Sequence, residues 1–301
     1  MLQKLKRDVI RNKYVYIMAI PVVLFYILFH YIPMGGMVIA FQDYHPARGI
    51  TGSEWVGFEN FIKFFSDYQF PRLIRNTLLL STELIIFTFP APLILALLIN
   101  ELRWKGYKKF VQTVSYLPHF VSLVVICAII SDFTSSDGVI NQVLSMFGVE
   151  PTTWLMNPSL FRPIYVVSDL WQQIGWNSIV YLAAISAIDP GMYEAATIDG
   201  AGRLRHMWNI TLPSLVPTIT ILFIMRIGNV MTIGHEKVLL LYNPTIYETA
   251  DIISTFIYRR GLLDSDYGFS TAVGIFNSVI NCILLCTANH VSRRLTENSL
   301  W

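Results

Sequence analysis

Long apolar stretches separated by short polar segments constrain this chain more than any other feature of its sequence. With 54% hydrophobic residues, 14% charged residues and a mean hydropathy of +0.51 over 301 residues, the chain is far more apolar than a soluble domain of this size. The stretches are close to or above the length that crosses a bilayer as a helix. The predicted spans are 14–29, 77–100, 111–130, 165–188, 214–233 and 271–291. The sequence therefore predicts an all-α integral membrane protein with six transmembrane helices.

The first apolar stretch follows a basic segment, as in a secretory signal, but no small-residue cleavage site follows it, so we interpret it as an uncleaved helix. Basic residues in short loops set the orientation, because such loops stay in the cytoplasm. They precede the first span, crowd the loops after the second and fourth spans, and follow the last span: Lys4, Lys6, Arg7, Arg11, Lys13, Arg103, Lys105, Lys108, Lys109, Arg203, Arg205, Arg293 and Arg294. Both termini are therefore expected in the cytoplasm. Loop 131–163, whose single basic residue is Arg162, is expected outside, and so is the last connecting loop, 234–270.

The predicted organisation has four parts. They are a basic cytoplasmic N-terminus over 1–13, the first transmembrane helix and its outer loop over 14–76, a core with five transmembrane helices over 77–291, and a cytoplasmic tail over 292–301. The polar segment 189–213 lies between the fourth and fifth spans. The alternation of the spans places this segment in the cytoplasm.

Segment 189–213 carries the signals of a helix, a turn and a second helix. Asp189 is a residue type that caps helices, and Pro190 suits the first helical position because its missing N–H costs nothing there. Asp199 and Gly200 then predict a turn and a second cap. The small residues of this segment would let another protein approach its backbone closely, which favours a docking surface. An amphipathic loop that rests on the membrane surface is the alternative.

The same segment resembles the EAA loop of importer permeases in the ABC transporter superfamily. Glu-Ala-Ala starts at Glu194, a glycine follows at Gly200, and Ile210 and Leu212-Pro213 complete the pattern. In that family the loop is a coupling helix that sits in a cleft of the ATP-binding subunit. The resemblance implies this coupling role for Tyr193, Glu194, Ala195, Ala196, Asp199, Gly200, Ala201 and Gly202.

Short matches elsewhere resemble the branch of this family that imports oligosaccharides, including fragments of plant and algal polysaccharides. They lie at 32–36, 55–61, 241–244 and 251–261. The match at 55–61 implies a short helix along the outer membrane surface, and an interfacial aromatic belt is a compatible alternative. Because the coupling motif is shared with importers of amino acids, peptides and phosphate, a peptide or amino acid cargo remains an alternative.

The resemblance also implies a complete transporter around this chain in the bacterial cytoplasmic membrane. A second transmembrane permease subunit would complete the pathway, and two copies of a cytoplasmic ATP-binding subunit would hold ATP and Mg²⁺. An extracellular or periplasmic sugar-binding protein would deliver the oligosaccharide. This chain itself is expected to hold no cofactor. It has no Gly-rich phosphate loop that ends in Gly-Lys-Ser or Gly-Lys-Thr, so we expect no ATP hydrolysis by this subunit and no other enzymatic activity.

Polar residues within the predicted spans indicate where cargo passes, because polar side chains in a membrane are costly unless they face a cavity or a partner helix. On the fourth span they recur with helical spacing, and polar residues of the second, fifth and last spans lie at a similar depth. The candidate pathway residues are Glu83, Asp169, Gln172, Gln173, Trp176, Asn177, Arg226, Asn229, Asn277 and Asn281. We expect them to line one chamber that opens to the outside.

Two interpretations remain for Arg226. It forms an internal ion pair with Glu83 or Asp169, which we favour because an unpaired arginine in a membrane is costly, or it donates to a sugar hydroxyl or carboxylate. Aromatic residues of the fourth span are candidates either to stack on sugar rings or to pack in the bundle: Trp171, Trp176 and Tyr181. Only Trp176 shares the polar face.

Other classes of protein fit the sequence less well. Cys127, Cys282 and Cys286 lie inside predicted spans, so they form no disulfide framework, and packing explains the last two better than a metal ion does. A net charge of +2 gives nucleic acid no basic surface to bind. A transporter driven by an ion gradient would need paired intramembrane carboxylates and matching halves with broken helices, and the sequence has neither.

Overall fold

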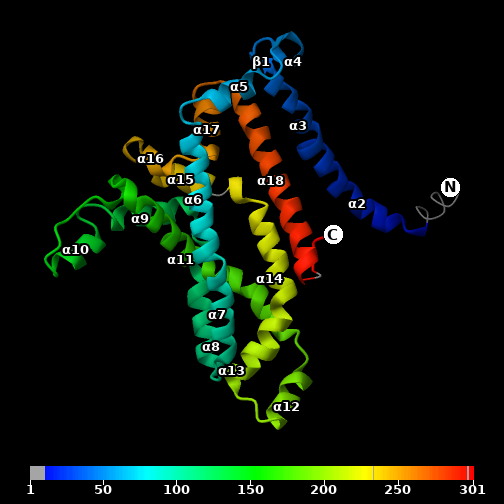
Figure 1. The fold of residues 1–301 in the computed structure, drawn as a ribbon, viewed down its shortest axis with the longest axis vertical. Coiled ribbons are helices and arrows are strands. Elements are labelled where there is room, and N and C mark those ends of the chain that lie inside the picture. The colour runs from blue at the N-terminus through cyan, green and yellow to red at the C-terminus, as the bar shows by residue number, and fades with distance from the viewer. Residues whose placement is uncertain (1–10, 233, 297) are drawn as a thin grey trace. The chain divides into compact units, whose positions relative to one another are not determined.

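The computed structural model describes residues 11–232, 234–296 and 298–301, and most of these residues are helical. Contacts divide the chain into two compact units. The first unit consists of Met1–Asp67 and Ile257–Ile275, and the second of Tyr68–Phe256 and Phe276–Trp301. Figure 1 shows the helices of both units.

The first unit begins with a long apolar helical segment. Its parts are α2 (Lys13–Tyr26), the π-helical turn η1 (Ile27–Tyr31), α3 (Ile32–Met34) and the 3₁₀ helix η2 (Gly35–Phe41). A short antiparallel hairpin follows, in which β1 (Gln42–Asp43) pairs with β2 (Glu54–Trp55). The helix α4 (Gly49–Gly52) connects the two strands.

The helix α5 (Glu59–Ser66) packs beside this hairpin. The buried side chain of Asn60 donates hydrogen bonds to the carbonyl oxygens of Ala40 and Gln42, at 2.9 and 3.1 Å. These bonds fix the first turn of α5 against the base of the hairpin. A helix therefore forms near the segment 55–61 that the sequence singles out, but it begins at Glu59.

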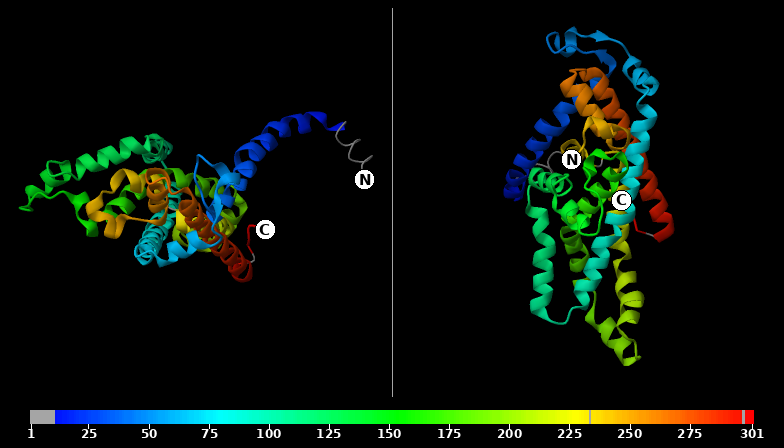
Figure 2. Two further views of the ribbon diagram at one scale, coloured as in Figure 1. Left: turned by 90° about the horizontal axis from the view of Figure 1, so that it is seen from above. Right: turned by 90° about the vertical axis from the view of Figure 1, so that its left-hand side faces the viewer.

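The second unit is a bundle of helices with shorter helical segments between them. Its longer helices are α6 (Phe70–Thr88), α7 (Pro90–Glu101), α8 (Lys105–Tyr116), α9 (Leu123–Phe133), α11 (Pro158–Ser186) and α14 (Leu212–Ile227). The shorter segments are η3 (Leu117–Phe120), α10 (Val139–Ser145), η4 (Trp154–Met156), α12 (Pro190–Ile198), α13 (Arg203–His206), η5 (Met207–Thr211), η6 (Val230–Thr232), α15 (His235–Leu241), η7 (Pro244–Ile246) and α16 (Tyr247–Ala250). Along the chain, α17 (Ile253–Tyr258), η8 (Arg259–Leu263) and α18 (Tyr267–Thr296) follow. The α7–α8 connection and α12 lie at the same end of this unit (Figures 1 and 2).

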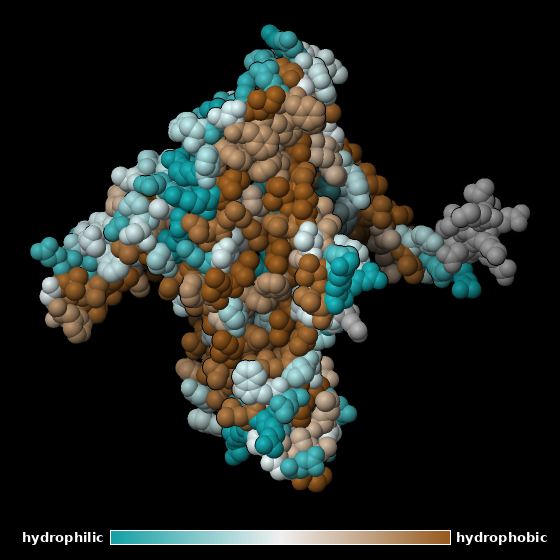
Figure 3. All heavy atoms as spheres, in the orientation of Figure 1, coloured by the Kyte–Doolittle hydropathy of each residue, from teal (hydrophilic) through white to brown (hydrophobic). Residues whose placement is uncertain are grey.

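Several helical segments are long and apolar enough to cross a membrane. They are Lys13–Phe41, Phe70–Glu101, Arg203–Ile227 and Tyr267–Thr296, and a further candidate is the pair Lys105–Phe120 and Leu123–Phe133, which is bent by 98°. Large apolar side chains such as Leu98, which is 62% exposed, face outward from them. Figure 3 shows apolar residues over much of the visible flank and hydrophilic residues at the end that carries α12. The described residues therefore form an all-α membrane protein with four or five apolar spans.

Three of the predicted spans differ from the structure. The third, 111–130, is not one straight helix, because the helical segment Lys105–Phe120 ends at Val121 and Ser122, whose backbone leaves the helical conformation, and the next helix begins at Leu123 at an angle of 98°. The fourth, 165–188, falls mostly within α11, which is long enough to cross but is not among the apolar candidates because polar side chains line one of its faces. The fifth helix ends at Ile227, and residue 233, where the predicted span ends, lies outside the described residues.

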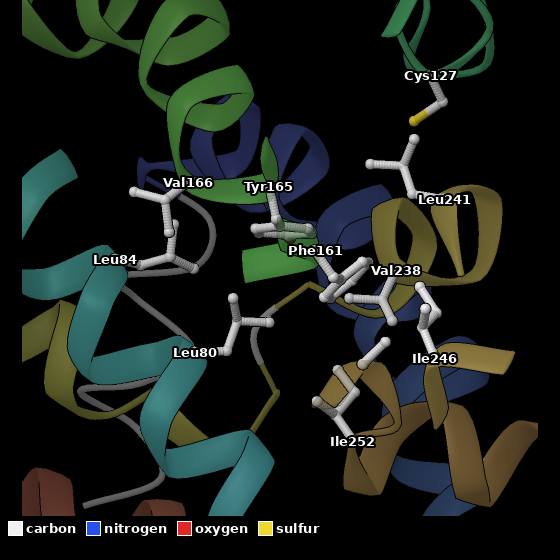
Figure 4. Close-up of a cluster of buried hydrophobic side chains, with 11 residues drawn as sticks. Leu80, Leu84, Cys127, Phe161, Tyr165, Val166, Val238, Leu241, Ile246 and Ile252 are labelled. Atoms are coloured by element: carbon white, nitrogen blue, oxygen red, sulfur yellow. The ribbon is translucent and has the colours of Figure 1, made fainter. Parts of the chain in front are cut away.

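The segment after α14, which the sequence predicts as an outer loop, belongs to the folded core of the second unit. Figure 4 shows how α15 and the segment after it pack near α6 and α11. The buried cluster consists of Leu80, Leu84, Cys127, Phe161, Tyr165, Val166, Val238, Leu241, Ile246, Ala250 and Ile252. Asn76 on α6 donates hydrogen bonds to the carbonyl oxygens of Glu248 and Asp251 at 2.9 and 3.0 Å. Since these bonds satisfy carbonyl groups near the end of α16, α6 holds the segment in place.

The helix α11 approaches the backbone of α8 at Gly175. A Cβ built at this position would lie 2.0 Å from the carbonyl oxygen of Ser115. No side chain fits in that space, so glycine is required for the two helices to meet. This close approach brings the polar face of α11 beside η3.

Candidate functional site

The helix α12 begins as the sequence predicts. The Asp189 side chain accepts a hydrogen bond from the backbone N–H of Gly191 at 2.9 Å. Pro190 occupies the first helical position, where its missing N–H leaves no donor unsatisfied. The start of α12 is therefore fixed by local sequence alone.

The end of α12 depends on Gly200. Its φ of +78° lies in the left-handed region, where a side chain is strained, although an added Cβ would have no atom within 4 Å. The N–H of Ala201 donates to the carbonyl oxygen of Ala196 at 2.9 Å, as in a Schellman motif. The predicted second cap at Asp199 is wrong, because Asp199 ends α12 and α13 begins after Gly202, which has no side chain to cap it.

The surface of α12 is exposed in this chain. None of its residues is buried, and Ile198 at its end is 86% exposed. Glu194 and Ala195 are exposed, and Ala196 is partly exposed. An exposed isoleucine beside small residues suits contact with another protein. The predicted coupling residues thus lie together on one accessible helix and turn.

Tyr193 ties α12 to the start of α14. Its hydroxyl lies 3.0 Å from Oγ1 of the buried Thr211, and its ring meets His206 edge-on with centroids 5.8 Å apart. Thr211 is the last residue of the π-helical turn η5, directly before α14. Sequence reasoning identified Tyr193 through the coupling motif but missed His206 and Thr211, because no spacing rule links them to a tyrosine in another element.

A cavity of about 530 Å³, here called the first chamber, lies between α7, α11 and α14. Its wall includes six of the predicted pathway residues: Asp169, Gln173, Trp176, Asn177, Arg226 and Asn229. The helical spacing on α11 therefore points several of them at one space. Their role in transport stays a prediction.

A second cavity of about 570 Å³, the second chamber, shares Asp169 and Gln173 with the first. Its wall adds His119 from η3, Gln172 from α11 and Lys237 from α15. Sequence reasoning missed His119 and Lys237, because both lie outside the polar stripe of α11. Only the tertiary fold brings them to it.

His119 and Trp176 stack between the two chambers. Their ring centroids are 4.3 Å apart and their planes differ by 3°, and Nδ1 of His119 lies 3.0 Å from Oε1 of Gln173. This stack fixes the plane of the indole ring that lines the first chamber. Tyr181 also lines the first chamber, whereas Trp171 lines a separate apolar pocket.

The ion pair predicted for Arg226 does not form. Glu83 instead pairs with Arg162, at 3.9 Å between Oε1 and Nη1. Asp169 pairs with Lys237, at 3.8 Å between Oδ1 and Nζ. Burial lowers the pKa of Lys237, which lies outside the apolar spans, and the neighbouring Asp169 partly offsets this shift. Both predicted partners of Arg226 are therefore engaged by other cations.

Arg226 keeps its charge available in the first chamber. Its Nη2 donates a long hydrogen bond, 3.4 Å, to Oγ1 of Thr88. Among the described residues, no carboxylate lies within ion-pair distance of this guanidinium, although Asp169 in the same chamber attracts it from farther away. The first chamber thus presents a cation, several amides and an aromatic ring to whatever enters it.

The remaining predicted pathway residues lie elsewhere. Glu83 faces Arg162 outside the chambers. Asn281 accepts a hydrogen bond from the backbone N–H of Met231 at 2.9 Å and so anchors η6. Asn277 is buried on α18, where its Oδ1 has no hydrogen-bond partner among the described residues. These three residues line neither chamber, which corrects the prediction of one chamber for all of them.

Polar chambers inside an apolar helical bundle, with an exposed capped helix between α11 and α14, define the class of a helical membrane transport protein. Residues 88–297 match the family described as "Binding-protein-dependent transport system inner membrane component". The chain belongs to this family. It is therefore a multi-pass subunit of the bacterial cytoplasmic membrane and a transport component rather than an enzyme.

Relatives of known name agree with this assignment. The chain is 44% identical to the polygalacturonan/rhamnogalacturonan transport system permease protein YteP of Bacillus subtilis (strain 168), over 99% of this chain and 94% of that protein. It is also 44% identical to Protein LplB of the same organism, over 97% and 92%. One chain of a bacterial alginate ABC transporter, solved in complex with an alginate pentasaccharide-bound periplasmic protein, superposes with a TM-score of 0.90 at 44% identity, covering 98% of this chain and 99% of that chain. The chain is thus a permease subunit of an ATP-driven ABC importer and not a gradient-driven carrier.

Proposed function

We propose that this subunit forms part of the import pathway for an acidic oligosaccharide, which an extracellular binding protein delivers. The proposal that the cargo is negatively charged rests on Arg226. Its guanidinium lines the first chamber and has no carboxylate partner in the described residues. A sugar-acid carboxylate matches the guanidinium fork with two parallel hydrogen bonds. Relatives support this proposal, since one is named for polygalacturonan and another solved transporter imports the acidic polysaccharide alginate.

Other groups of the first chamber suit the neutral parts of a sugar. The indole of Trp176, held flat by His119, offers a face for the apolar C–H side of a sugar ring. Gln173, Asn177 and Asn229 offer amide donors and acceptors for hydroxyl groups. In this proposal the aromatic face and the amides orient the sugar, and Arg226 selects for its charge.

The proposed topology has six transmembrane spans, with α11 as the fourth and the bent α8–α9 pair as the third. The basic α7–α8 connection and α12 lie at the same end of the second unit, which supports a shared cytoplasmic side (Figure 2). Both termini then lie in the cytoplasm. The polar stripe of α11 faces the first chamber, which explains how a helix with so many polar residues crosses the membrane.

The proposed assembly contains a second permease subunit that completes the pathway and two copies of an ATP-binding subunit that hold ATP and Mg²⁺. The helix α12 docks in a cleft of one ATP-binding subunit and moves when ATP closes the pair. The contact between Tyr193 and Thr211 passes this movement to α14, which carries Arg226 into the first chamber. A capped helix transmits such a movement better than a flexible linker.

The test is ATP-driven uptake by the reconstituted transporter, comparing an acidic oligosaccharide with its carboxyl-reduced, neutral form. Arg226→Met removes the charge and keeps the stem. Since a hydrogen bond to a charged group contributes about 1.5–3 kcal/mol, we expect the KM for the acidic cargo to rise about 10- to 150-fold. Arg293→Met, which removes an exposed arginine that lines neither chamber, is the matched control. Equal KM values for both cargoes in the wild type would refute the acidic assignment.

A further inference from the structure

Lys237 is a buried cation without a hydrogen-bond partner in the part of the chain that the structure describes. Only 5% of its side chain is exposed, and its Nζ lies 3.8 Å from Oδ1 of Asp169. The same ammonium lies 5.0 Å from the centroid of the Tyr165 ring. The ion pair is therefore longer than a charge-assisted hydrogen bond, which is about 2.7–2.9 Å. The N–H donors of Lys237 remain unused.

This arrangement leaves the ammonium poorly stabilised. Burial of a charge is costly unless close pairing and hydrogen bonds offset the loss of water. Here Asp169 and the face of Tyr165 attract the charge, but neither approaches to hydrogen-bonding distance. A carboxylate that did approach so closely would bind Lys237 better than Asp169 does.

The second chamber leads to this ammonium. The polar residues that line it are Lys237, Asp169, His119, Gln172, Gln173, His235 and Glu236, so Glu236 adds a second carboxylate to its wall. The Asp169 side chain is 21% exposed, whereas Nζ of Lys237 is out of reach of solvent. A ligand in this chamber therefore meets Asp169 first and reaches Lys237 only when Asp169 moves aside. Asp169 also lines the first chamber, so its carboxylate has space there when it moves away from Lys237.

The helix α15, which carries Lys237, begins after a glycine that packs against Tyr165. The helix α14 ends at Ile227, and a short segment leads through η6 to Gly234, whose φ is +83°. A Cβ at Gly234 would lie 2.6 Å from the Tyr165 hydroxyl oxygen, so glycine is required for α15 to approach α11 this closely. Arg226 lies on α14, and Lys237 lies on α15, which follows α14 and η6 along the chain.

We propose that the second chamber is a carboxylate subsite, in which a sugar-acid carboxylate of the cargo displaces Asp169 and bonds directly to Lys237. This inference rests on the proposed import of acidic oligosaccharides and adds a second cation to Arg226. A neutral sugar has no group that displaces Asp169, so the ion pair between Asp169 and Lys237 stays intact when such a sugar binds. Lys237 and Asp169 together then select cargo by charge.

The experiment compares uptake of an alginate pentasaccharide with uptake of its carboxyl-reduced form by the complete reconstituted transporter. Lys237→Met removes the ammonium, and Asp169→Asn leaves the ammonium without its competing carboxylate. We expect Lys237→Met to raise the KM for the acidic cargo about tenfold or more, and Asp169→Asn to lower it severalfold. For the neutral cargo we expect smaller changes in the KM, because that cargo has no carboxylate to compete with Asp169. Lys237→Arg, which keeps the charge, should retain the preference for acidic cargo.

Each single variant leaves one buried charge without its partner, and a double variant controls for this effect. Lys237→Met with Asp169→Asn removes both charges together, and it should transport the two cargoes with more similar KM values. Arg162→Met with Glu83→Gln removes another partly buried ion pair, one that lines neither chamber, and should keep the wild-type preference. If Lys237→Met does not assemble, Asp169→Asn alone decides, because an unchanged KM for the acidic cargo overturns the inference.

The outcomes separate this inference from the proposed function. A wild-type transporter that shows no preference for acidic cargo refutes both. If the wild type prefers acidic cargo and Arg226→Met loses the preference, while the Lys237 and Asp169 variants keep it unchanged, the carboxylate subsite alone is refuted. Loss of the preference in both sets of variants supports the subsite.

Discussion

Replacement of Gly200 by alanine should uncouple ATP hydrolysis from uptake without unfolding the protein. The residue has a φ of +78°, and an added Cβ would have no atom within 4 Å, so the cost is conformational rather than steric. The left-handed conformation costs a residue with a side chain about 1–2 kcal/mol. This free energy corresponds to about a 5- to 30-fold fall in the fraction of molecules in which α12 ends in the Schellman conformation. It is only a fraction of the free energy of unfolding of a typical protein, which is about 5–15 kcal/mol.

The assay is the number of ATP molecules hydrolysed per oligosaccharide imported into proteoliposomes. We expect Gly200→Ala to raise this ratio severalfold at normal assembly, and Gly200→Asn, which tolerates the left-handed region, to raise it less. Gly148→Ala is the matched control, because Gly148 has a φ of +81° and equally open surroundings but lies in a turn after α10. If both alanine variants gave the same ratio as the wild type, the reasoning about α12 would be refuted.

Three further changes test other contacts. Glu194→Lys reverses an exposed charge on α12 and should abolish most uptake at normal expression; normal uptake would contradict the coupling role. Tyr193→Phe removes the hydroxyl that lies 3.0 Å from Thr211 Oγ1, a contact that contributes about 1 kcal/mol, and should raise the ATP consumed per sugar while lowering the melting temperature by only about 2–4 °C. Gly175→Ala places a Cβ 2.0 Å from the carbonyl oxygen of Ser115 and should lower the melting temperature, at a cost of about 1–3 kcal/mol or more. Gly36→Ala, with nothing within 4 Å, is its control, and equal melting temperatures would contradict the packing of α8 on α11.

Local signals in the sequence predicted the helix start and the turn of segment 189–213. The cap at Asp189 and the turn at Gly200 depend on neighbouring residues only, so their residue types are sufficient evidence. The prediction of a second helix cap at Asp199 was wrong. Gly200 and Gly202 permit the turn without any capping side chain, and helix signals of this kind do not fix which residue ends one helix and which begins the next.

The charges of the membrane region could not be paired from the sequence. Helical spacing placed Asp169 on the face of α11 that lines the chambers, because that depends only on one helix. Its partner, Lys237, lies in a segment that the sequence predicts as an outer loop, and packing of this segment into the core brings the two together. The alternation of apolar spans gives no information about such packing. The preferred partner of Arg226 was wrong for this reason.

The bend in the third span shows a similar limit. Apolar length predicted a continuous helix over 111–130, whereas the helix ends at Phe120 and the next one begins at Leu123 at an angle of 98°. His119 lies in the last turn before this break and stacks on Trp176 between the two chambers. The residues at the break, Val121 and Ser122, carry no strong helix-ending signal, so the apolar length of the stretch hid it.

ATP-driven uptake by purified components tests the central claim most directly. The measurement is import of an acidic oligosaccharide into proteoliposomes that hold this chain, a second permease and the ATP-binding subunits, with the binding protein outside. Import that requires both internal ATP and the binding protein, and that Gly200→Ala uncouples from ATP hydrolysis, is the predicted result. Import that continues without ATP while an ion gradient is kept would contradict the account.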